Sequence, residues 1–396
     1  MTPEHTDIFI AGGGIAGLVA ALGFAKRGLT VVLADPGPLP SGVNTSDLRS
    51  TAYLQPARAL LEEIGVWSSL DTYATPLEVL RVIDCAGDPP EARTTRAFEA
   101  ADLGAPAFGW NLPNSLTRNV LYEAAVSHPL IDLRFGIGFQ ALLARDLEAI
   151  VTLSDKSRLK ARLAVAADGR ASPLREAAGI GTDTVRYGQK ALAFSVTHTT
   201  PHDDISTELY HEGGAFVLVP LPDQNGLSAS AVVWMNDGPE ALRLADLSES
   251  EFAAAATLRS TGVLGPLTLA SDRQVWPVIT QRAHHLTARR VAIIAEAAHV
   301  LPPIGAQGLN TSLMDVRRLL DLASNTPETV GSADTLTRFA RERETDIAAR
   351  TRVIDLYNRL CRSGAPPMQA MRSLGLRLAH DVEPLRQSLM RAGLGT

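Results

Sequence analysis

Short runs of consecutive apolar residues alternate with helical patterns at both ends of the chain. Apolar runs at 8–10 and 31–33 flank a helical pattern that ends at Arg27, and a further run, 291–294, precedes a small-residue turn, a Pro/Gly loop and another helical pattern. Uninterrupted apolar runs of this length are typical of strands that are buried on both faces of a parallel sheet. The two ends of the chain therefore predict an α/β fold.

The middle of the chain, from about 191 to 276, has strand-like runs separated by Pro and Gly turns, which predicts a mostly antiparallel sheet with a helical insertion at 246–259. Elsewhere we expect a strand at 79–83, helices at 57–64 and 116–126, and a β-meander of strands near 131–135, 149–153 and 162–167.

These elements predict a Rossmann-like nucleotide-binding domain interleaved with a second domain, the antiparallel sheet, and followed by C-terminal helices. The expected boundaries are 1–75, 105–185 and 280–332 for the discontinuous nucleotide-binding domain, 76–104 and 186–279 for the sheet domain, and 333–396 for the helical region.

The C-terminal region repeats apolar residues at helical spacing, and we interpret its Arg341-Glu342-Arg343-Glu344 run as a solvated face. From Arg359 onward the chain contains six arginines and only two acidic residues, with Met and Leu residues between the arginines. Such a basic helical end fits a lipid surface or the mouth of an amphiphilic-substrate site, and packing on the body of the protein is the alternative.

Composition narrows the possible classes of function. The 396 residues carry a net charge of −6, which argues against general nucleic-acid binding. Cys85 and Cys361 are isolated, so no disulfide framework or zinc site is expected and a reducing cytoplasm fits best.

We expect His198 and His202 to be sheet-edge residues rather than metal ligands, because no third ligand residue accompanies them at the spacing of a metal site. GxSxG, HExxH and Walker motifs do not occur, which leaves hydrolase and nucleotide-triphosphatase functions unsupported.

The uncharged stretch 8–25 is interpreted as a dinucleotide-binding turn and its helix. The preceding residues include acids, and three consecutive glycines would weaken a membrane-spanning helix. Gly12, Gly14 and Gly17 form GxGxxG between a strand and a helix, and Asp35 ends the next strand, where an acid receives ribose hydroxyls. Only one such unit occurs, so one stably bound dinucleotide is implied, with FAD as the natural candidate.

Two other segments place polar residues at the ends of strands. Asp168-Gly169 follows a strand and precedes Ser172-Pro173, which also has the order of an N-cap and a first helical residue. The loop 302–308 opens a helix whose N–H groups would attract an anionic or electron-rich group near 305–310. Arg49 is equally compatible with a phosphate or flavin contact and with a solvated surface position. Arg118 lies in a first helical turn, which indicates a role such as phosphate binding.

Together these segments resemble the class A FAD-dependent aromatic monooxygenases of the para-hydroxybenzoate hydroxylase fold. Within that group, residues 298–310, AHVLPPIGAQGLN, are similar to the UbiH/UbiF-type hydroxylases of ubiquinone biosynthesis. The resemblance runs nearly end to end and implies an FAD-binding domain with FAD as cofactor and NAD(P)H as transient co-substrate. The cofactor-binding residues that it implies are Gly12, Gly14, Ala16, Gly17, Asp35, Arg49, Arg118, Asp168, Gly169, Glu296, Pro303, Gly305, Gly308, Leu309 and Asn310, with Arg175 completing the Asp-Gly motif.

The reaction implied by the resemblance is hydroxylation of a phenolic ring. NAD(P)H reduces FAD, and reduced flavin and O₂ form a C4a-hydroperoxide whose distal oxygen passes to the ring. Pro303 is expected over the flavin, and the strand at 215–219 is expected to line the ring pocket, with Phe216, Val219 and Pro303 as substrate residues. No catalytic base is assigned, since His299 is equally compatible with a structural turn.

One pair of residues departs from the family pattern. The family has Gly-Asp before Ala-Ala-His, with the Asp on the ribityl chain, whereas this chain has Ala295-Glu296. Glu can still accept that hydrogen bond, but Ala does not adopt a positive φ at low cost. FAD affinity is the property that this Gly-to-Ala change is expected to affect.

The leading hypothesis is therefore a polyprenylphenol hydroxylase of ubiquinone biosynthesis. The expected partners are a hydrophobic aromatic substrate, the inner face of the membrane through the C-terminal region, and a biosynthetic complex or a second copy of the chain. Nucleic acid is not expected. One alternative is a hydroxylase of a soluble aromatic or secondary metabolite, and a second is a non-catalytic flavin-binding scaffold.

Overall fold

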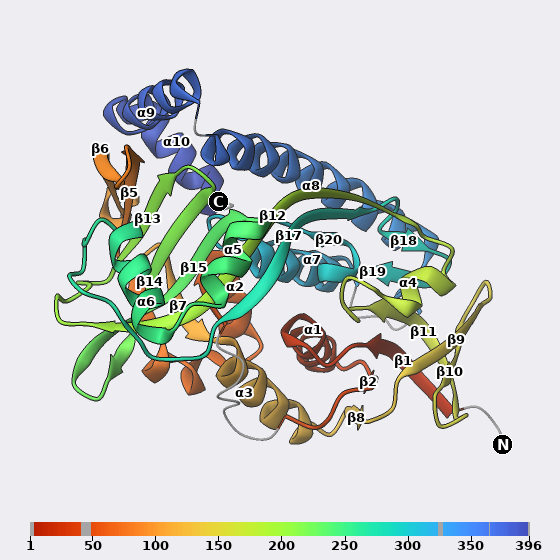
Figure 1. Ribbon diagram of the computed structural model, residues 1–396. Coiled ribbons are helices and arrows are strands. Elements are labelled where there is room, and N and C mark those ends of the chain that lie inside the picture. The colour runs from red at the N-terminus through yellow and green to blue at the C-terminus, as the bar shows by residue number, and fades with distance from the viewer. Residues whose placement is uncertain (1–3, 41–48, 324–327, 364, 395–396) are drawn as a thin grey trace.

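Two large sheets lie side by side and are joined by helices in the computed structural model, which describes residues 4–40, 49–323, 328–363 and 365–394 (Figure 1). Asp47 and Leu48, which precede Arg49, lie outside these residues. Within the described ranges, no helix combines the length and the apolar character needed to cross a bilayer. The same residues contain no cluster of three or more His, Cys, Asp or Glu side chains suited to a metal ion.

The first sheet has a parallel centre in which β1 lies between β11 and β2, with β19 beyond β11 and β8 beyond β2. Towards their carboxyl ends the inner strands are buried apolar runs, 8–11 in β1 and 163–166 in β11, as expected for a sheet covered on both faces. The strands are β1 (Glu4–Ala11), β2 (Val31–Asp35), β8 (Ile131–Phe135), β9 (Phe139–Ala144), β10 (Ala149–Leu153), β11 (Arg158–Ala166), β18 (Thr287–Ala288) and β19 (Val291–Ile293).

The expected β-meander is wrong in its first strand. β8 pairs with β2 in parallel, and the antiparallel meander consists of β9, β10 and β11 instead. The strand β9 was not expected. Its exposed and half-buried residues show no strict alternation, so period 2 was hard to see in the sequence.

The second sheet is mostly antiparallel and has one parallel pair, β13 with β5. Alternating residues of its strands build two separate apolar clusters, one on each face. Its strands are β5 (Val79–Ala86), β6 (Glu91–Glu99), β12 (Thr182–His198), β13 (Ile205–His211), β14 (Gly214–Gln224), β15 (Leu227–Asp237), β16 (Thr268–Leu269), β17 (Gln274–Ala283) and β20 (His299–Val300).

A small third sheet, which was not expected, links the two large ones. It consists of β3 (Ser50–Leu54), β7 (Gly109–Pro113) and β4 (Thr75–Leu77), with β7 in the middle. The Asn111 amide donates to the carbonyl oxygen of Pro220 at 2.8 Å and so attaches β7 to β14 of the second sheet.

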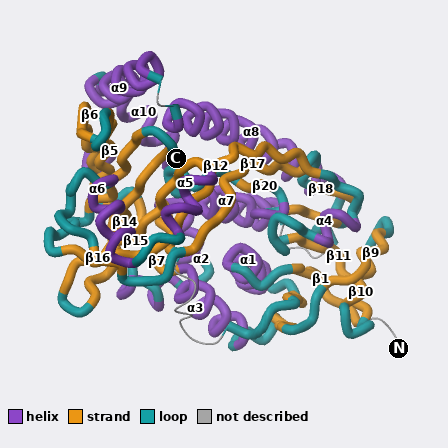
Figure 2. Tube along the Cα trace, in the orientation of Figure 1, coloured by secondary structure: helices purple, strands orange, loops and turns teal. Residues whose placement is uncertain are grey.

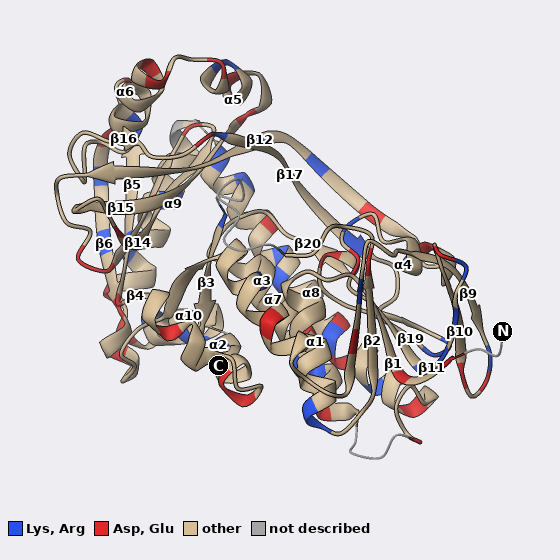
Figure 3. Ribbon diagram, turned by 90° about the horizontal axis from the view of Figure 1, so that it is seen from below, with Lys and Arg blue, Asp and Glu red and all other residues tan. Residues whose placement is uncertain are grey.

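Helices lie between the two large sheets, and others lie beside the second sheet (Figure 2). Viewed from below, α1, α3 and α7 lie between the first and second sheets (Figure 3). The α-helices are α1 (Ile15–Lys26), α2 (Gln55–Glu63), α3 (Asn114–Val126), α4 (Pro173–Ala177), α5 (Gly238–Ala245), α6 (Glu249–Arg259), α7 (Gln307–Leu322), α8 (Ala333–Arg362), α9 (Pro366–Asp381) and α10 (Glu383–Leu394), and the 3₁₀ turns are η1 (Trp67–Ser69), η2 (Asp71–Tyr73), η3 (Ala100–Leu103) and η4 (Ala295–Ala297).

The helical insertion expected at 246–259 is confirmed as α6, which begins with a capping box between Ser248 and Glu251. The helix α5, which precedes this range, was not expected, and one expectation about α8 needs correction. In α8, Arg343 is buried, so the charged run at 341–344 is not wholly a solvated face. Arg343 shares the buried stripe of Phe339 and Ile347, which lie four residues before it and four residues after it.

Candidate functional site

The glycine turn lies at the carboxyl end of β1, the central strand of the first sheet. Gly12 has φ of +107°, and a Cβ there would clash with the carbonyl oxygen of Ala167 at the end of β11. At Gly14 no heavy atom of the described residues lies within 4 Å of an added Cβ, and this residue is the N-cap of α1 without a side-chain cap. The start of α1 therefore offers uncapped N–H groups beside open space, an arrangement that suits a phosphate.

Asp35 and Arg118 both hold the backbone of this turn. The Asp35 carboxylate accepts from the N–H of Gly13 at 2.6 Å and from the N–H of Gly37 at 2.7 Å. Each carboxylate oxygen retains acceptor capacity, so ribose hydroxyls can still bind. The Arg118 Nε donates to the carbonyl oxygen of Gly13 at 2.8 Å, which positions this cation beside the glycine turn.

The Asp168-Gly169 segment follows β11, next to the glycine turn. One Asp168 oxygen accepts from the N–H of Leu174 at 3.1 Å, while the other, Oδ1, is buried and has no hydrogen-bond partner in the part of the chain that the structure describes. Burial raises the pKa of Asp168 above its ordinary value. A buried acceptor without a partner is costly, so this oxygen is a candidate to receive a hydroxyl of a bound molecule.

The turn after β19 contains the departure from the family pattern. Ala295 has φ of +56°, the left-handed conformation that the sequence indicated would be costly for alanine. Its N–H donates to Oδ2 of Asp315 at 3.0 Å, which holds the turn in place. The neighbouring Glu296 side chain is exposed, and Arg175 donates to the carbonyl oxygen of Ala297 at 3.0 Å. Arg175 thus joins the Asp168-Gly169 segment to this turn.

The start of α7 is a second helix N-terminus without a side-chain cap. Its N-cap, Ala306, has φ of +55°, and Gly308 has open space around its Cα. Asn310 is buried, and its amide donates to Ala52 and Ala306 carbonyls, each at 2.7 Å, while its oxygen accepts from the N–H of Leu54 at 2.9 Å. Asn310 therefore fixes the start of α7 against β3.

These features fit the FAD that the sequence indicated. Two uncapped helix starts offer donors for a pyrophosphate and for an electron-rich ring, and Gly14 leaves space at the first of them. The Oδ1 atom of Asp168 is a buried acceptor that still needs a donor. For other expected cofactor residues the structure gives a position but no contact that tests their role. The Arg49 guanidinium lies 5.5 Å from the centre of the Trp276 ring. Ala16 is buried in α1, Pro303 is exposed and Leu309 is half-buried.

Comparison with known proteins agrees with this geometry. Residues 5–352 match the model of the FAD binding domain family. The chain belongs to this family. It is an FAD-dependent aromatic-ring monooxygenase, and its cofactor is FAD.

Two relatives are similar to the monooxygenase over their whole length. It is 30% identical to the ubiquinone hydroxylase UbiL of Rhodospirillum rubrum, covering 98% of this chain and 90% of the relative. It is 27% identical to the 3-demethoxyubiquinol 3-hydroxylase of Escherichia coli, covering 100% of both chains. Among solved structures, p-nitrophenol 4-monooxygenase PnpA of Pseudomonas putida has the same fold, with a TM-score of 0.80, 20% identity, and coverage of 99% of this chain and 98% of that one.

A buried ionic network behind the Ala295 turn was not found from the sequence. Asp315 of α7 is fully buried and accepts from His299 Nε2 at 2.7 Å and from Arg343 Nε at 2.8 Å, in addition to the N–H of Ala295. Burial by itself would raise the pKa of Asp315, but attraction by His299 and Arg343 outweighs it and holds the pKa below its usual value. The carboxylate therefore stabilises the fold above the ordinary pKa of an aspartate, and this contribution is lost as the pH falls through the lowered value.

The signal for this network was present in the helical patterns. Asp315 falls next to Val316, on the side of α7 that also buries Leu319 and Leu322, and Arg343 falls on the apolar stripe of α8. A charged residue on an apolar stripe is seldom buried unless it is paired. His299 is buried too, and its hydrogen bond to Asp315 favours the structural interpretation that the sequence left open.

The expected substrate residues lie on opposite faces of the second sheet. Val219 packs with the cluster that contains Ile304 of the Pro/Gly loop, whereas Phe216 packs against Trp234 and α6 on the other face. Phe216 is therefore corrected from a pocket residue to a core residue. The physical reason is strand alternation, since positions three apart point to opposite faces. His198, expected at a sheet edge, is also buried, and its Nε2 atom lies 2.9 Å from the Ser230 hydroxyl.

A polar pair on the Ile304 side of this sheet was missed as well. Glu208 and Tyr210 of β13 are buried in contact with each other, and Tyr210 donates to the Glu208 carboxyl group. Burial raises the pKa of Glu208. Alternating positions 208 and 210 share a face with Val217, which pairs with Glu208 across the strands. The sequence did not indicate this pair, because nothing in it identifies which strands of this sheet are neighbours.

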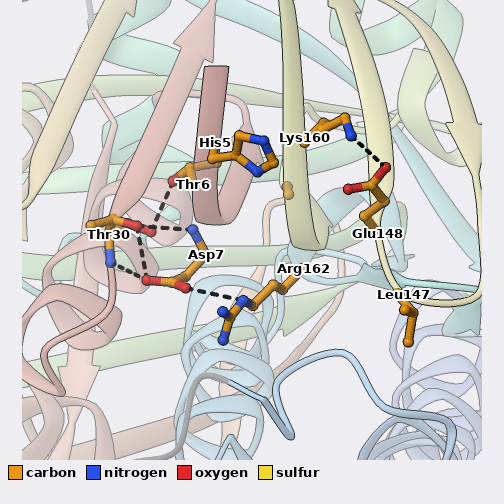
Figure 4. Close-up of a pocket in the computed structure, with 9 residues that line it drawn as sticks. His5, Thr6, Asp7, Thr30, Leu147, Glu148, Lys160 and Arg162 are labelled. Carbon is orange, nitrogen blue, oxygen red and sulfur yellow. Dashed lines mark hydrogen bonds and ion pairs between the residues drawn. The ribbon is translucent and has the colours of Figure 1, made fainter. Parts of the chain in front are cut away.

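A cavity of about 310 Å³ lies away from this site and is lined by residues at the start of β1 and β11 (Figure 4). Its charged groups pair with one another, Lys160 with Glu148 at 3.0 Å and Arg162 with Asp7 at 3.4 Å. Ligands of open α/β sheets bind at the carboxyl ends of the strands, so this cavity at the opposite ends is not the cofactor site.

Replacing Ala295 with glycine is expected to stabilise the monooxygenase. Glycine removes the conformational strain of a positive φ, and this gain is larger than the cost of the extra entropy that glycine gives the unfolded chain. The free energy of unfolding should therefore rise by about 0.5–1 kcal/mol, with FAD affinity unchanged or higher. Urea denaturation and FAD fluorescence titration measure the two quantities. The matched control is Ala297→Gly in the same turn, which has no positive φ and should lower stability. Equal loss of stability in both variants would contradict the interpretation.

Proposed function

We propose that the monooxygenase hydroxylates the phenolic ring of a polyprenylphenol intermediate of ubiquinone biosynthesis, with NAD(P)H and O₂ as co-substrates. The two full-length relatives named as hydroxylases of ubiquinone or demethoxyubiquinol support this substrate class. Bound FAD supplies the electron transfer and oxygen activation. The chain's own residues bind and orient the cofactor and the ring, and keep water out of the site.

The observation that carries the proposal is the apolar face of β14 and β15. Ala215, Val217 and Val219 on one strand and Val233 and Met235 on the next pack in the same cluster as Ile304. Neither strand contains an Arg or Lys. A soluble aromatic acid needs a cation or several donors for its carboxylate, whereas a prenylated phenol needs apolar surface.

The protein side of the reaction follows from the two helix starts and the buried polar groups. Uncapped N–H groups at the start of α7 would stabilise negative charge on the bound cofactor without reorganisation. The Glu208 carboxyl and the Tyr210 hydroxyl share the apolar face with Val217 and are candidates to hydrogen-bond the phenol. This assignment would explain how an apolar pocket orients one polar substituent of the ring.

A substrate comparison tests the proposal. We expect NAD(P)H oxidation by the FAD-loaded protein to rise at least about tenfold with a short-chain prenylated phenol, and a product heavier by one oxygen atom to appear in mass spectrometry. 4-Hydroxybenzoate, which lacks the chain and carries a carboxylate, should give neither. Hydroxylation of 4-hydroxybenzoate alone would favour the soluble-metabolite alternative, and protein that binds FAD but oxidises no NAD(P)H with any phenol would favour the scaffold alternative.

A further inference from the structure

Asn111 lies on the small sheet that links the two large sheets, and its side chain is directed towards the second of them. Its neighbours along β7, Trp110 and Leu112, pack with the core of the first sheet. Because successive residues of a strand point to opposite faces, Asn111 points the other way. Its amide donates to the carbonyl oxygen of Pro220 in β14 at 2.8 Å, and the residue is only 1% exposed.

The carboxamide oxygen of Asn111, Oδ1, is buried and accepts no hydrogen bond from any described residue. The amide cannot be turned round without placing two carbonyl oxygens against each other at Pro220, so Oδ1 is an acceptor at a fixed position. A buried acceptor that lacks a donor destabilises a fold. Such an atom therefore marks a place that a water molecule or a bound ligand completes.

The cofactor side of the molecule lies one strand away from Asn111. Its cross-strand neighbour in β3 is Ala52, whose carbonyl oxygen accepts from the Asn310 amide at the start of α7 at 2.7 Å. Neighbouring strands of a sheet are about 4.8 Å apart. The strand β3 lies between α7 and the second sheet (Figure 3). Asn111 is therefore near the helix start that suits the electron-rich ring of the cofactor.

The candidate substrate face lies on the other side of Asn111. Pro220, which accepts from its amide, follows Val219, and Val219 packs with the cluster that contains Ile304. A ring that is hydroxylated must contact both the cofactor and this apolar face. Asn111 thus brings one neutral acceptor to the junction at which such a ring would lie.

We propose that Oδ1 of Asn111 accepts a hydrogen bond from the hydroxyl group of the substrate ring. A phenol with a pKa near that of tyrosine, about 10, keeps its proton at neutral pH and can donate it to this oxygen. A carboxylate has only acceptors and would be repelled by Oδ1, so Asn111 would favour a phenol over an aromatic acid. The inference rests on the phenolic substrate of the proposed function and adds the residue that recognises its hydroxyl group.

The Glu208–Tyr210 pair is the other polar group of the apolar face, and Asn111 is the better acceptor for the hydroxyl. Tyr210 already donates to the Glu208 carboxyl group, so part of the hydrogen-bonding capacity of this pair is used within the protein. Oδ1 of Asn111 receives no donor from the described residues. A substrate hydroxyl therefore removes a larger penalty at Asn111.

Ligand binding to the FAD-loaded chain, without NAD(P)H, tests the inference. The ligands are a short-chain prenylated phenol and the same prenylated ring without its hydroxyl group, and the change in flavin absorbance gives both dissociation constants. We expect the natural chain to prefer the phenol by at least about tenfold. In Asn111→Leu and Asn111→Ala, which lack the acceptor, this preference should fall below about twofold or reverse, because the phenol hydroxyl is then buried without a partner.

Two companion variants separate recognition of the hydroxyl from attachment of the small sheet. Asn111→Asp keeps an acceptor oxygen at this position and should retain most of the preference. Gln55→Met is the matched control: the Gln55 amide donates to the carbonyl oxygen of Ala107 at 2.8 Å, so its loss removes a similar attachment beside the same sheet and should leave the preference unchanged.

The outcomes distinguish failure of the inference from failure of the proposed function. A preference that is unchanged in Asn111→Leu and Asn111→Ala, or that is lost equally in Gln55→Met, would overturn the inference and leave the proposed function intact. A natural chain that binds neither ligand would overturn the proposed function and the inference with it.

Discussion

An Asp315→Asn variant is expected to unfold about 3 kcal/mol more easily than the natural chain and to bind FAD at least tenfold more weakly. The loss of stability follows from burial, because Asp315 is fully buried and balances the buried Arg343. Removing one charge of a buried pair leaves the other charge buried and unpaired. The stability lost in this way is larger than the net stability that the intact pair provides. Urea denaturation of the apoprotein measures this loss.

The effect on FAD has a separate cause. Asp315 accepts from the N–H of Ala295, and that hydrogen bond holds the turn at a positive φ next to the expected ribityl position. An amide at 315 has one oxygen for three donors, so the turn loses part of its restraint. FAD titration of folded apoprotein, at a temperature well below its transition, measures this effect independently of stability.

A rescue and a control test the positioning role of Asp315. In the Asp315→Asn background, Ala295→Gly should restore much of the FAD affinity, because glycine adopts the positive φ without help, but it should recover only a small part of the stability. Asp346→Asn is the control: its carboxylate also pairs with Arg343, at 2.6 Å, but is 35% exposed, so the loss should be below about 1 kcal/mol. Unchanged FAD affinity in folded Asp315→Asn protein would refute the role.

The parts of the site that were predictable are local in sequence. Gly12, Gly14 and Asp35 lie within one strand–helix–strand unit, and each has a residue type that its backbone or ligand role demands. The Ala295 irregularity was also visible, because an alanine replaced a residue that needs a positive φ. Where the geometry of a site depends on residues that are close in the chain, the types of those residues indicate it, so it can be predicted from a single sequence.

Contacts between distant segments were not predictable in the same way. Asp315 and Arg343 are 28 residues apart and meet because α7 and α8 pack together, which no local pattern specifies. The pairing of β8 with β2 had the same cause, since strand order depends on the whole sheet. Phe216 is a different case: the strand was correctly expected, and strict use of its period of two would have placed Phe216 and Val219 on opposite faces.

The roles of the charged and apolar residues in the C-terminal tail could not be told from composition alone. The sequence left packing and lipid contact as alternatives for its arginines and Met/Leu residues. In the structure Arg372 serves packing through its pair with Asp84, while Met371 and Leu374 beside it are exposed. The helix is thus attached through Arg372, Ser373 and the partly buried Leu376, which is a packing role that a count of charges in the tail does not reveal.

Gly14→Ala is expected to lower FAD affinity by about ten- to a hundredfold while leaving the stability of the apoprotein within about 0.5 kcal/mol. The added methyl group meets no atom of the described residues within 4 Å, and the backbone at Gly14 has φ of −76°, which alanine adopts freely. The methyl group would instead occupy the space in which a pyrophosphate approaches the first N–H groups of α1, and would weaken one or two charge-assisted hydrogen bonds.

Two companion variants make this result specific. Gly375→Ala also adds a methyl group in open space, inside α9, and should leave FAD affinity unchanged while slightly raising stability. Gly12→Ala should lower both quantities, because its φ of +107° and the nearby Ala167 carbonyl oxygen leave no room for a side chain. FAD fluorescence titration and urea denaturation of all three variants therefore separate cofactor space from fold constraint. If Gly14→Ala bound FAD as tightly as Gly375→Ala, the pyrophosphate could not lie against the start of α1, and the cofactor site would have to be placed elsewhere along the strand ends.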